Sequence, residues 1–327
     1  MHKWPDLLAN TYEIARASIA LLDDQLLRRP TPCSEWSVGE LCDHLVGSIE
    51  MFATAAGAPP RGAAPEGTSL QRFDAAVERS LAAWRALDDT TGVLTLPFGA
   101  FPVEVVAGMN HMDSLVHAWD LAAALGLPLA IPDQLAEAAL QTAQVTVPPF
   151  RGHGFGPELA PAGNSAGQRL LAFSGRDVTA WPGAIWCAGS LVSVKTDPAA
   201  GGPASVVEIW EREGSGPPRH VHADQDELWY VLDGSFTFAL GDREFQAGPG
   251  EVVVGPRGVP HTFRADTNHS RLLDIHTPGG FERFFLHAGA PATALVPPEP
   301  KPRANPRDLL AKIESFGAKV VGPPLAA

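Results

Sequence analysis

Apolar side chains recur at helical intervals through the first half of the chain. This spacing predicts one helix over residues 6–27 and a second over 38–55. Ser37 and Glu40 form a Ser-x-x-Glu capping box at the start of the second helix. A third helix is predicted over residues 70–87, again with its apolar residues along one face. The first half of the chain is therefore predicted to be α-helical.

A fourth helix, predicted over residues 102–125, carries a polar stripe within an apolar pattern. The polar residues recur at intervals of three, four and three, and they are Asn110, Asp113, His117 and Asp120. Such a stripe either faces water or lines an internal site. Asp113 and His117 can ligate one ion together, and His44 of the second helix can supply a third ligand, because helical bundles build metal sites from facing helices.

The other polar residues of this helix have weaker predicted roles. Asn110 and Asp120 are predicted to support the ligands or to take part in helix packing. His111 lies on a different face of the helix, so it is predicted to be exposed. An alternative for the whole stripe is an inactive scaffold that has kept the helices and lost the chemistry.

The periodicity changes in the second half from helical to strand-like. Short runs rich in β-branched and aromatic residues alternate with Gly, Pro and Asp, and they cover residues 191–195, 206–210, 228–232, 236–240, 251–254 and 272–276. Many short strands at close spacing predict a β-sandwich or barrel. The domains are accordingly predicted at residues 1–177 and 189–327, joined by a connection over 178–188. A loop over 57–67 and a Pro-rich stretch over 297–302 are also expected.

The strongest chemical signal is the motif His220-Val221-His222, followed by Glu227. Side chains of an extended strand alternate between faces, so the two histidines point the same way. Two imidazoles and a carboxylate directed at one point suit a divalent metal. Ordinary strand histidines are the alternative, and the surrounding glycines at regular spacing argue against it.

A second segment, GEVVVGPRGVPHTFRA, adds Gly250, Pro256, Gly258 and His261. Together the two segments resemble the two motifs of the cupin superfamily, and only Ala265 departs from the second, where the family usually has Asn. The resemblance implies a double-stranded β-helix, or jelly roll, in which His220, His222, Glu227 and His261 bind Fe, Mn, Ni, Co or Zn. Glu227, if released from the metal, could act as a general base. His276 is predicted to be a strand residue near the pocket without a role.

The first half carries a second resemblance. The segments PTPCSEWSVGELCDHLVG and NHMDSLVHAWDLAAALG, with FSGRD ending at Asp177, look like the DinB-like four-helix bundles of the mycothiol-dependent maleylpyruvate isomerase group. The resemblance implies that His44, Asp113 and His117 bind a second divalent, Zn-like metal that activates a low-molecular-weight thiol such as mycothiol. Asp113 stands where the group has Glu, which is longer by one methylene.

The composition of the chain limits which classes of binding partner are expected. The 327 residues carry a formal net charge of -13 without basic runs, so nucleic acid and anionic membrane surfaces are not expected as partners. No apolar stretch is long enough to span a bilayer, and a cytoplasmic protein is expected. Cys33, Cys42 and Cys187 show no Cys-x-x-Cys spacing, so neither a disulfide framework nor a zinc knuckle is supported. Cupins commonly dimerise through their sheets, and a homodimer through this domain is the expectation.

Two functional hypotheses follow. The first is a bifunctional or two-site metalloenzyme, in which a cupin dioxygenase-like centre acts on a small aromatic-derived or enolic substrate and the helical domain is a mycothiol-dependent isomerase or transferase. The C-terminal segment NPRDLLAKIESFGAKVVGPPL resembles the tail of small quercetinase-like cupins, which favours a dioxygenase. The second hypothesis is a non-catalytic small-molecule-binding cupin sensor with a scaffold helical bundle.

Overall fold

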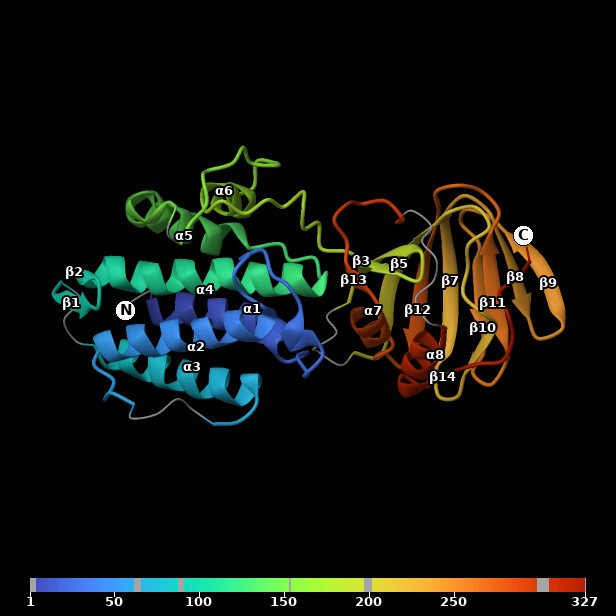
Figure 1. Ribbon diagram of the computed structural model, residues 1–327, viewed down its shortest axis with the longest axis horizontal. Helices are drawn as coiled ribbons and strands as arrows, with labels where there is room; N and C mark the ends of the chain where they lie inside the picture. Colours follow the sequence, from blue (N-terminus) through green and yellow to red (C-terminus); the bar gives the residue numbers. More distant parts are fainter. Residues whose placement is uncertain are drawn as a thin grey trace. The chain divides into compact units, whose positions relative to one another are not determined.

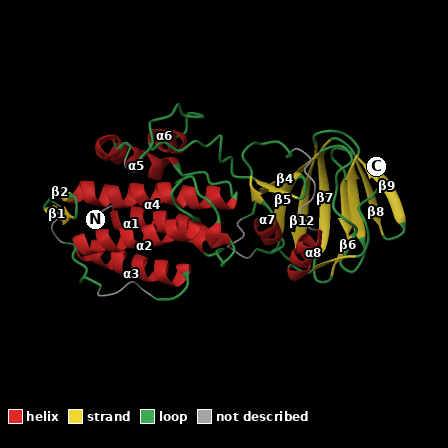
Figure 2. Cartoon of the chain, viewed as in Figure 1, coloured by secondary structure: helices red, strands yellow, loops and turns green. Residues whose placement is uncertain are grey.

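The chain divides into a helical unit and a strand-rich unit, as Figures 1 and 2 show. The computed structural model describes residues 4–61, 66–87, 91–152, 154–196, 202–298 and 306–326. The first unit comprises Met1–Ala124 with Leu129–Ala180, and the second comprises Leu125–Pro128 with Trp181–Ala327. The main division lies between Ala180 and Trp181, within the segment predicted as a connection. The loop predicted over 57–67 and the Pro-rich stretch over 297–302 lie partly outside the described residues.

The helical unit is a four-helix bundle with additional elements, as the sequence predicts. Its main helices are α1 (Trp4–Ile19), α2 (Val38–Ala55), α3 (Ser69–Ala86) and α4 (Val103–Leu125). The Ser37–Glu40 capping box is present at the start of α2. The first helix is shorter than predicted and ends at Ile19. A separate 3₁₀ turn follows at Leu26–Arg28, and Asp23 Oδ1 accepts the backbone N–H groups of Gln25 and Leu26 in front of it. Within the described ranges, no helix is long and apolar enough to cross a membrane.

Helix α4 is buried on nearly every side, which the sequence pattern did not predict. The additional helices are α5 (Asp133–Thr146) and α6 (Ala166–Phe173), and a hairpin of β1 (Val93–Leu96) and β2 (Gly99–Pro102) precedes α4. Gly108 lets α5 approach closely, since a Cβ there would lie 2.4 Å from Thr142 Oγ1.

The predicted exposure of His111 is wrong for this reason. Its ring is fully buried, with Nδ1 2.8 Å from Thr11 Oγ1 and Nε2 2.9 Å from the carbonyl oxygen of Leu135 in α5. Burial lowers the pKa of His111, although the bond to Leu135 opposes that effect. His111 is thus a hydrogen-bonded core residue of the bundle.

The strand-rich unit is a sandwich of two antiparallel sheets with a jelly-roll arrangement. The first sheet runs in the order β10 (Val252–Gly255), β7 (Asp226–Asp233), β12 (Ser270–Thr277), β5 (Ser205–Glu211), β4 (Ser190–Val194), β3 (Ile185–Cys187) and β13 (Ala290–Pro291). The second runs in the order β14 (Ala318–Val320), β6 (His220–His222), β11 (His261–Ala265), β8 (Phe236–Leu240) and β9 (Arg243–Ala247). All six predicted strands are present, together with the short helices α7 (Glu282–Ala288) and α8 (Pro306–Ser315).

Aromatic side chains fill the space between the two sheets. Trp229 of β7 lies 5.3 Å from Phe238 of β8 and 6.4 Å from Phe263 of β11, measured between ring centroids. These rings are almost completely buried, so they form the hydrophobic core beside the polar residues of the same strands.

Candidate metal centres

The first candidate centre lies between the sheets of the strand-rich unit and draws residues from both. His220 and His222 come from β6, and His261 of β11 is the register partner of His220. Glu227 comes from β7 in the opposite sheet. Both histidines of β6 are buried while Val221 between them is only half-buried, as strand alternation requires.

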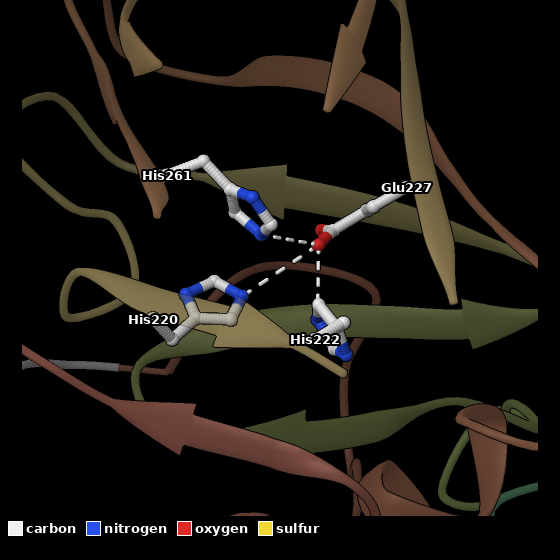
Figure 3. A group of neighbouring side chains, drawn as sticks. All are labelled: His220, His222, Glu227 and His261. Atoms are coloured by element: carbon white, nitrogen blue, oxygen red, sulfur yellow. Dashed lines mark ion pairs between the residues drawn. The ribbon is translucent and has the colours of Figure 1, made fainter. Parts of the chain in front are cut away.

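The three imidazoles converge on one carboxylate oxygen of Glu227 (Figure 3). Glu227 Oε2 lies 2.8 Å from His261 Nε2, 3.0 Å from His222 Nε2 and 3.6 Å from His220 Nε2. Their ligand atoms lie within 4.8 Å of one another, and all four residues are buried. The structure therefore brings together the four residues that the cupin resemblance implies.

Hydrogen bonds behind two of the rings decide which nitrogen faces the centre. His220 Nδ1 lies 2.8 Å from the Pro218 carbonyl oxygen, and His261 Nδ1 lies 2.9 Å from that of Val259. A carbonyl only accepts, so each Nδ1 carries a proton and donates it to the carbonyl, and each Nε2 faces Glu227. Gly258, at φ 76°, helps to hold β6 in place, since its N–H donates to the His222 carbonyl.

Unpartnered buried atoms of these residues indicate whether a cation fits the centre. His261 Nε2, Glu227 Oε2 and both ring nitrogens of His222 are buried without a hydrogen-bond partner. Lone pairs of nitrogen and oxygen facing one another repel unless a proton or a metal ion lies among them. Three imidazoles and one carboxylate are donors that suit a divalent transition metal, so the residues present fit such an ion.

The charges of the cage keep Glu227 ionised. Burial by itself would raise the pKa of Glu227, but the surrounding imidazoles, His276 foremost, hold that pKa well below its usual range. Burial likewise acts to lower the pKa of His220, and Glu227 reverses this and raises it. An ionised carboxylate is the form that binds a metal.

Two buried residues of β12 also face this centre, and the sequence analysis gave neither of them a role. His276 Nε2 lies 3.6 Å from Glu227 Oε2, and His276 Nδ1 lies 3.7 Å from Asp274 Oδ1. Burial lowers the pKa of His276 to about 3, with Glu227 opposing the shift. Burial and the adjacent Glu227 raise the pKa of Asp274 well above its usual range. The signal that could have revealed them is the alternation Asp274-Ile275-His276 in an apolar strand, which places both polar side chains on one face.

The second candidate centre lies in the helical bundle, between α2 and α4. Asp113 Oδ1 lies 3.5 Å from His117 Nε2 and 3.8 Å from His44 Nε2, and the ligand atoms of the three residues lie within 4.8 Å of one another. Ser48 donates to the other carboxylate oxygen of Asp113 at 2.6 Å. The side chain of His44 is 35% exposed, so this centre is open on one side. Trp36 packs against the His44 ring with centroids 4.4 Å apart.

A buried ionic network supports His117 from behind. Its Nδ1 lies 2.9 Å from Asp120 Oδ2, and Asp120 accepts two further bonds from Arg176, from Nη2 at 2.8 Å and from Nε at 3.2 Å. The thiol of Cys33 also donates to Asp120 Oδ2, at 3.3 Å. Asp120 thus contacts one ring nitrogen of His117 while the other, Nε2, faces Asp113.

Sequence reasoning missed four residues around this centre: Cys33, Trp36, Ser48 and Arg176. Arg176 belongs to the segment FSGRD, whose resemblance to the end of the domain was the one signal that pointed to it.

The network shifts the pKa of each charged member. Burial acts against ionisation, yet Arg176 and His117 lower the pKa of Asp120, and the two imidazoles of the site lower the pKa of Asp113. Burial acts to lower the pKa of His117, but Asp113 and Asp120 raise it well above its usual value. The carboxylates around His117 therefore favour its protonated form.

Comparisons with known proteins match each unit separately. The family model described as the mycothiol maleylpyruvate isomerase N-terminal domain matches residues 9–122, and the family model described as the cupin domain matches residues 206–276. The two matches cover the helices and the strands that carry the two candidate centres.

Individual relatives give the same division. An uncharacterized protein of Mycobacterium tuberculosis is 37% identical over 155 residues, which are 46% of this chain and 84% of that protein. Quercetin 2,3-dioxygenase of Bacillus subtilis is 31% identical over 105 residues, 32% of this chain and 31% of that enzyme. Among solved structures, KdgF from Halomonas sp. is 23% identical and covers 28% of this chain and 79% of its own, with a TM-score of 0.26.

Proposed function

Because this chain joins a domain of the mycothiol maleylpyruvate isomerase N-terminal family to a cupin domain, we propose that it is a two-site metalloenzyme. The cupin centre is a dioxygenase-like site for a small aromatic-derived or enolic substrate. The bundle centre is a thiol-dependent isomerase or transferase site. The alternative is a cupin that binds a small molecule without converting it, attached to a scaffold bundle.

One observation carries the cupin half of the proposal. Three buried imidazoles aim their nitrogens at Glu227 Oε2 from 2.8, 3.0 and 3.6 Å, and that oxygen, His222 Nε2 and His261 Nε2 have no hydrogen-bond partner among the described residues. A divalent ion held by these residues would supply Lewis-acid or redox chemistry to a substrate oxygen. The likeness to quercetin 2,3-dioxygenases supports an oxygen-dependent reaction and a substrate with an enolic or phenolic hydroxyl.

The residues around the cage have distinct tasks in this proposal. Glu227 is ionised and can accept the proton of a substrate hydroxyl that approaches its carboxylate. The rings of Phe281 and Trp229 lie against His222 and His261, at 4.7 and 5.2 Å between centroids, and they exclude water from the imidazoles. A dry surrounding strengthens each electrostatic interaction made inside it.

The bundle half of the proposal rests on His44, Asp113 and His117. Their donor atoms suit a Zn-like ion, and an ion held by three side chains can lower the pKa of a thiol by direct coordination. The exposed edge of His44 gives a low-molecular-weight thiol, mycothiol in this proposal, a path to the site. Held by these three residues, the ion would supply a thiolate nucleophile, which could add to the double bond of an unsaturated acid and leave again after rotation about that bond.

The two activities are chemically compatible. Oxidative ring cleavage yields unsaturated keto acids, which are electrophiles for a thiolate.

We also propose a homodimer through the cupin domain, because the edge strand β10 exposes Val252 and Val254 beside Tyr230 of β7. An exposed apolar edge strand is a ready pairing surface for a second copy.

Metal analysis combined with an oxygen-uptake assay tests the proposal. Purified full-length protein should contain divalent metal and consume O2 with a flavonol, a catechol or a gentisate-like acid, and His261→Ala should abolish the uptake. Cupin-site metal with tight substrate binding and no turnover would establish the binding-protein alternative. A cupin centre without affinity for any of the five metals would refute the metalloenzyme.

A further inference from the structure

Asp274 and His276 of β12 form, with Glu227 of β7, a second group of metal-type donors beside the cupin cage. The ligand atoms of these three residues lie within 4.8 Å of one another, and Glu227 belongs both to this group and to the cage. Asp274 and His276 lie outside the two motif segments, and they are only 3% and 1% exposed. Two carboxylates and an imidazole are donors that can bind a divalent cation.

The pairing of β12 with β7 places the three side chains on one face of the first sheet. His276 is the register partner of Glu227, and Asp274 is the register partner of Trp229, two positions further along β7. Side chains two positions apart on a strand share a face, so Asp274 and His276 lie on the inner face together with Glu227. The histidines of the cage come from the opposite sheet, so Glu227 has metal-type donors from both sheets around it.

The distances within this group suit an ion held between the donors. His276 Nε2 lies 3.6 Å from Glu227 Oε2, and His276 Nδ1 lies 3.7 Å from Asp274 Oδ1. Both separations are too long for hydrogen bonds. Two donors that each lie about 2.1 Å from a common ion, by contrast, are about 3–4 Å apart. Phe281 stacks on the imidazole with centroids 4.4 Å apart, which restricts rotation of the ring.

Each member of the group has a buried polar atom without a hydrogen-bond partner in the part of the chain that the structure describes. These atoms are Asp274 Oδ1, Glu227 Oε2 and His276 Nε2. Lone pairs of oxygen and nitrogen that face one another repel unless a cation or a proton lies among them. An ion in the cage takes a lone pair from Glu227, but Asp274 and His276 are not among the donors of the cage. A second cation would give both of them a partner.

We propose that Asp274, His276 and Glu227 form a second divalent-cation site, and that Glu227 bridges it to the ion of the cage. This inference rests on the proposed function, since Glu227 is shared with the cage. The mixed set of oxygen and nitrogen donors suits Mn(II) or Fe(II). Two divalent ions carry four positive charges against two carboxylates, so the pair favours a substrate that binds as an anion, such as an enolate.

The test is a Mn(II) titration of full-length protein in a His44→Ala background, in which the bundle centre has lost a donor. Chelator competition and metal analysis give the number of bound ions, and electron paramagnetic resonance reports whether two Mn(II) ions are close enough to couple. Asp274→Asn removes the charge of one donor, and His276→Phe removes the nitrogen of another, with little change in side-chain size. The matched controls are Asp242→Asn and His269→Ala, both at exposed positions.

We expect the parent protein to bind two Mn(II) ions in the cupin domain and to give a coupled signal. Asp274→Asn and His276→Phe should bind the second ion at least about tenfold more weakly and give the spectrum of an isolated ion. Both controls should match the parent. A single ion in the parent that is lost with His261→Ala, or two coupled ions in both variants, overturns the inference and leaves the proposed function intact. The absence of any ion that depends on His261 refutes the proposed function itself.

A crystal structure of the Mn(II)-loaded wild type decides the question independently of how the variants fold. Anomalous scattering should show two ions in the cupin domain about 3.5–4 Å apart, as in other two-metal sites. A single ion in the cage, with only a proton left to separate Asp274 from Glu227, overturns the inference.

Discussion

The substitution Asp120→Asn removes the charge at the centre of the bundle's buried network. Asp120 is fully buried and accepts hydrogen bonds from Arg176, His117 and Cys33. The asparagine retains one oxygen that can accept from His117. It cannot neutralise Arg176, whose side chain is 8% exposed and is left as an uncompensated buried charge.

The structure sets the size of the expected loss. Removing one partner of a buried ion pair costs about 3–5 kcal/mol of folding free energy, because the remaining charge stays desolvated. The chain offers a matched control in Asp74→Asn, where Asp74 pairs with Arg16 at 2.8 Å but both side chains are more than 40% exposed, at 42% and 43%. An exposed pair contributes about 0–1 kcal/mol, so the same change there should be nearly silent.

Urea unfolding followed by the helical circular dichroism signal measures both variants, with chelator present so that metal binding does not contribute. The helical transition is analysed by itself, since two-domain chains need not unfold in one step. Equal losses below about 1 kcal/mol in both variants would refute the reasoning. The double variant Asp120→Asn, Arg176→Met should recover much of the loss, because it removes the stranded charge as well.

The pH dependence of the wild type gives a second check on this network. The network lowers the pKa of Asp120, so the stability that Asp120 contributes is present above about pH 4 and disappears as the pH falls through its folded-state pKa. The Asp120→Asn variant should therefore lose less stability on acidification than the wild type does. An identical acid profile in the two proteins would contradict the assignment of the depressed pKa to Asp120.

Three further outcomes are expected. His261→Ala should weaken metal binding at the cupin centre by at least about tenfold, as chelator competition measures, whereas the exposed-histidine variant His269→Ala should bind like the wild type. Metal binding to the bundle centre should release a proton at neutral pH, because the pKa of His117 is raised by its carboxylate neighbours, and calorimetry in buffers of different ionisation enthalpy detects this. A signal independent of the buffer would contradict it. Val252→Lys with Val254→Lys should shift the protein from dimer to monomer in light scattering, and a mass unchanged by the charges would refute pairing through β10.

Much of the fold could be predicted because its signals are local. The capping box at Ser37 and Glu40, and the alternation of His220 and His222, depend on residues only a few positions apart. The first helix was predicted too long because the apolar spacing continues past Ile19, where the helix ends, into a separate 3₁₀ turn at Leu26–Arg28. His111 was misplaced because α5, which buries it, had not been predicted from the sequence.

The parts of the sites that escaped prediction depend on partners distant in the chain. Arg176 and Asp120 are 56 positions apart in the sequence, and the residues around each do not indicate that the two side chains pair. His261 was identified only through a resemblance to a family, since its pairing with His220 is a matter of strand register. Register is set by the whole sheet rather than by the residues on either side of a histidine.

The same distinction explains why His276 was predicted to be a strand residue without a role. Its neighbours Asp274 and Ile275 tell which face of a strand it occupies, but not which residue lies opposite. That residue is Glu227, some fifty positions earlier, and the pairing of β12 with β7 puts the imidazole beside the carboxylate. A histidine moved by one position along β12 would point to the outer face, away from Glu227. The surroundings of Glu227 are therefore set by the register of two strands and not by the metal-binding motif alone.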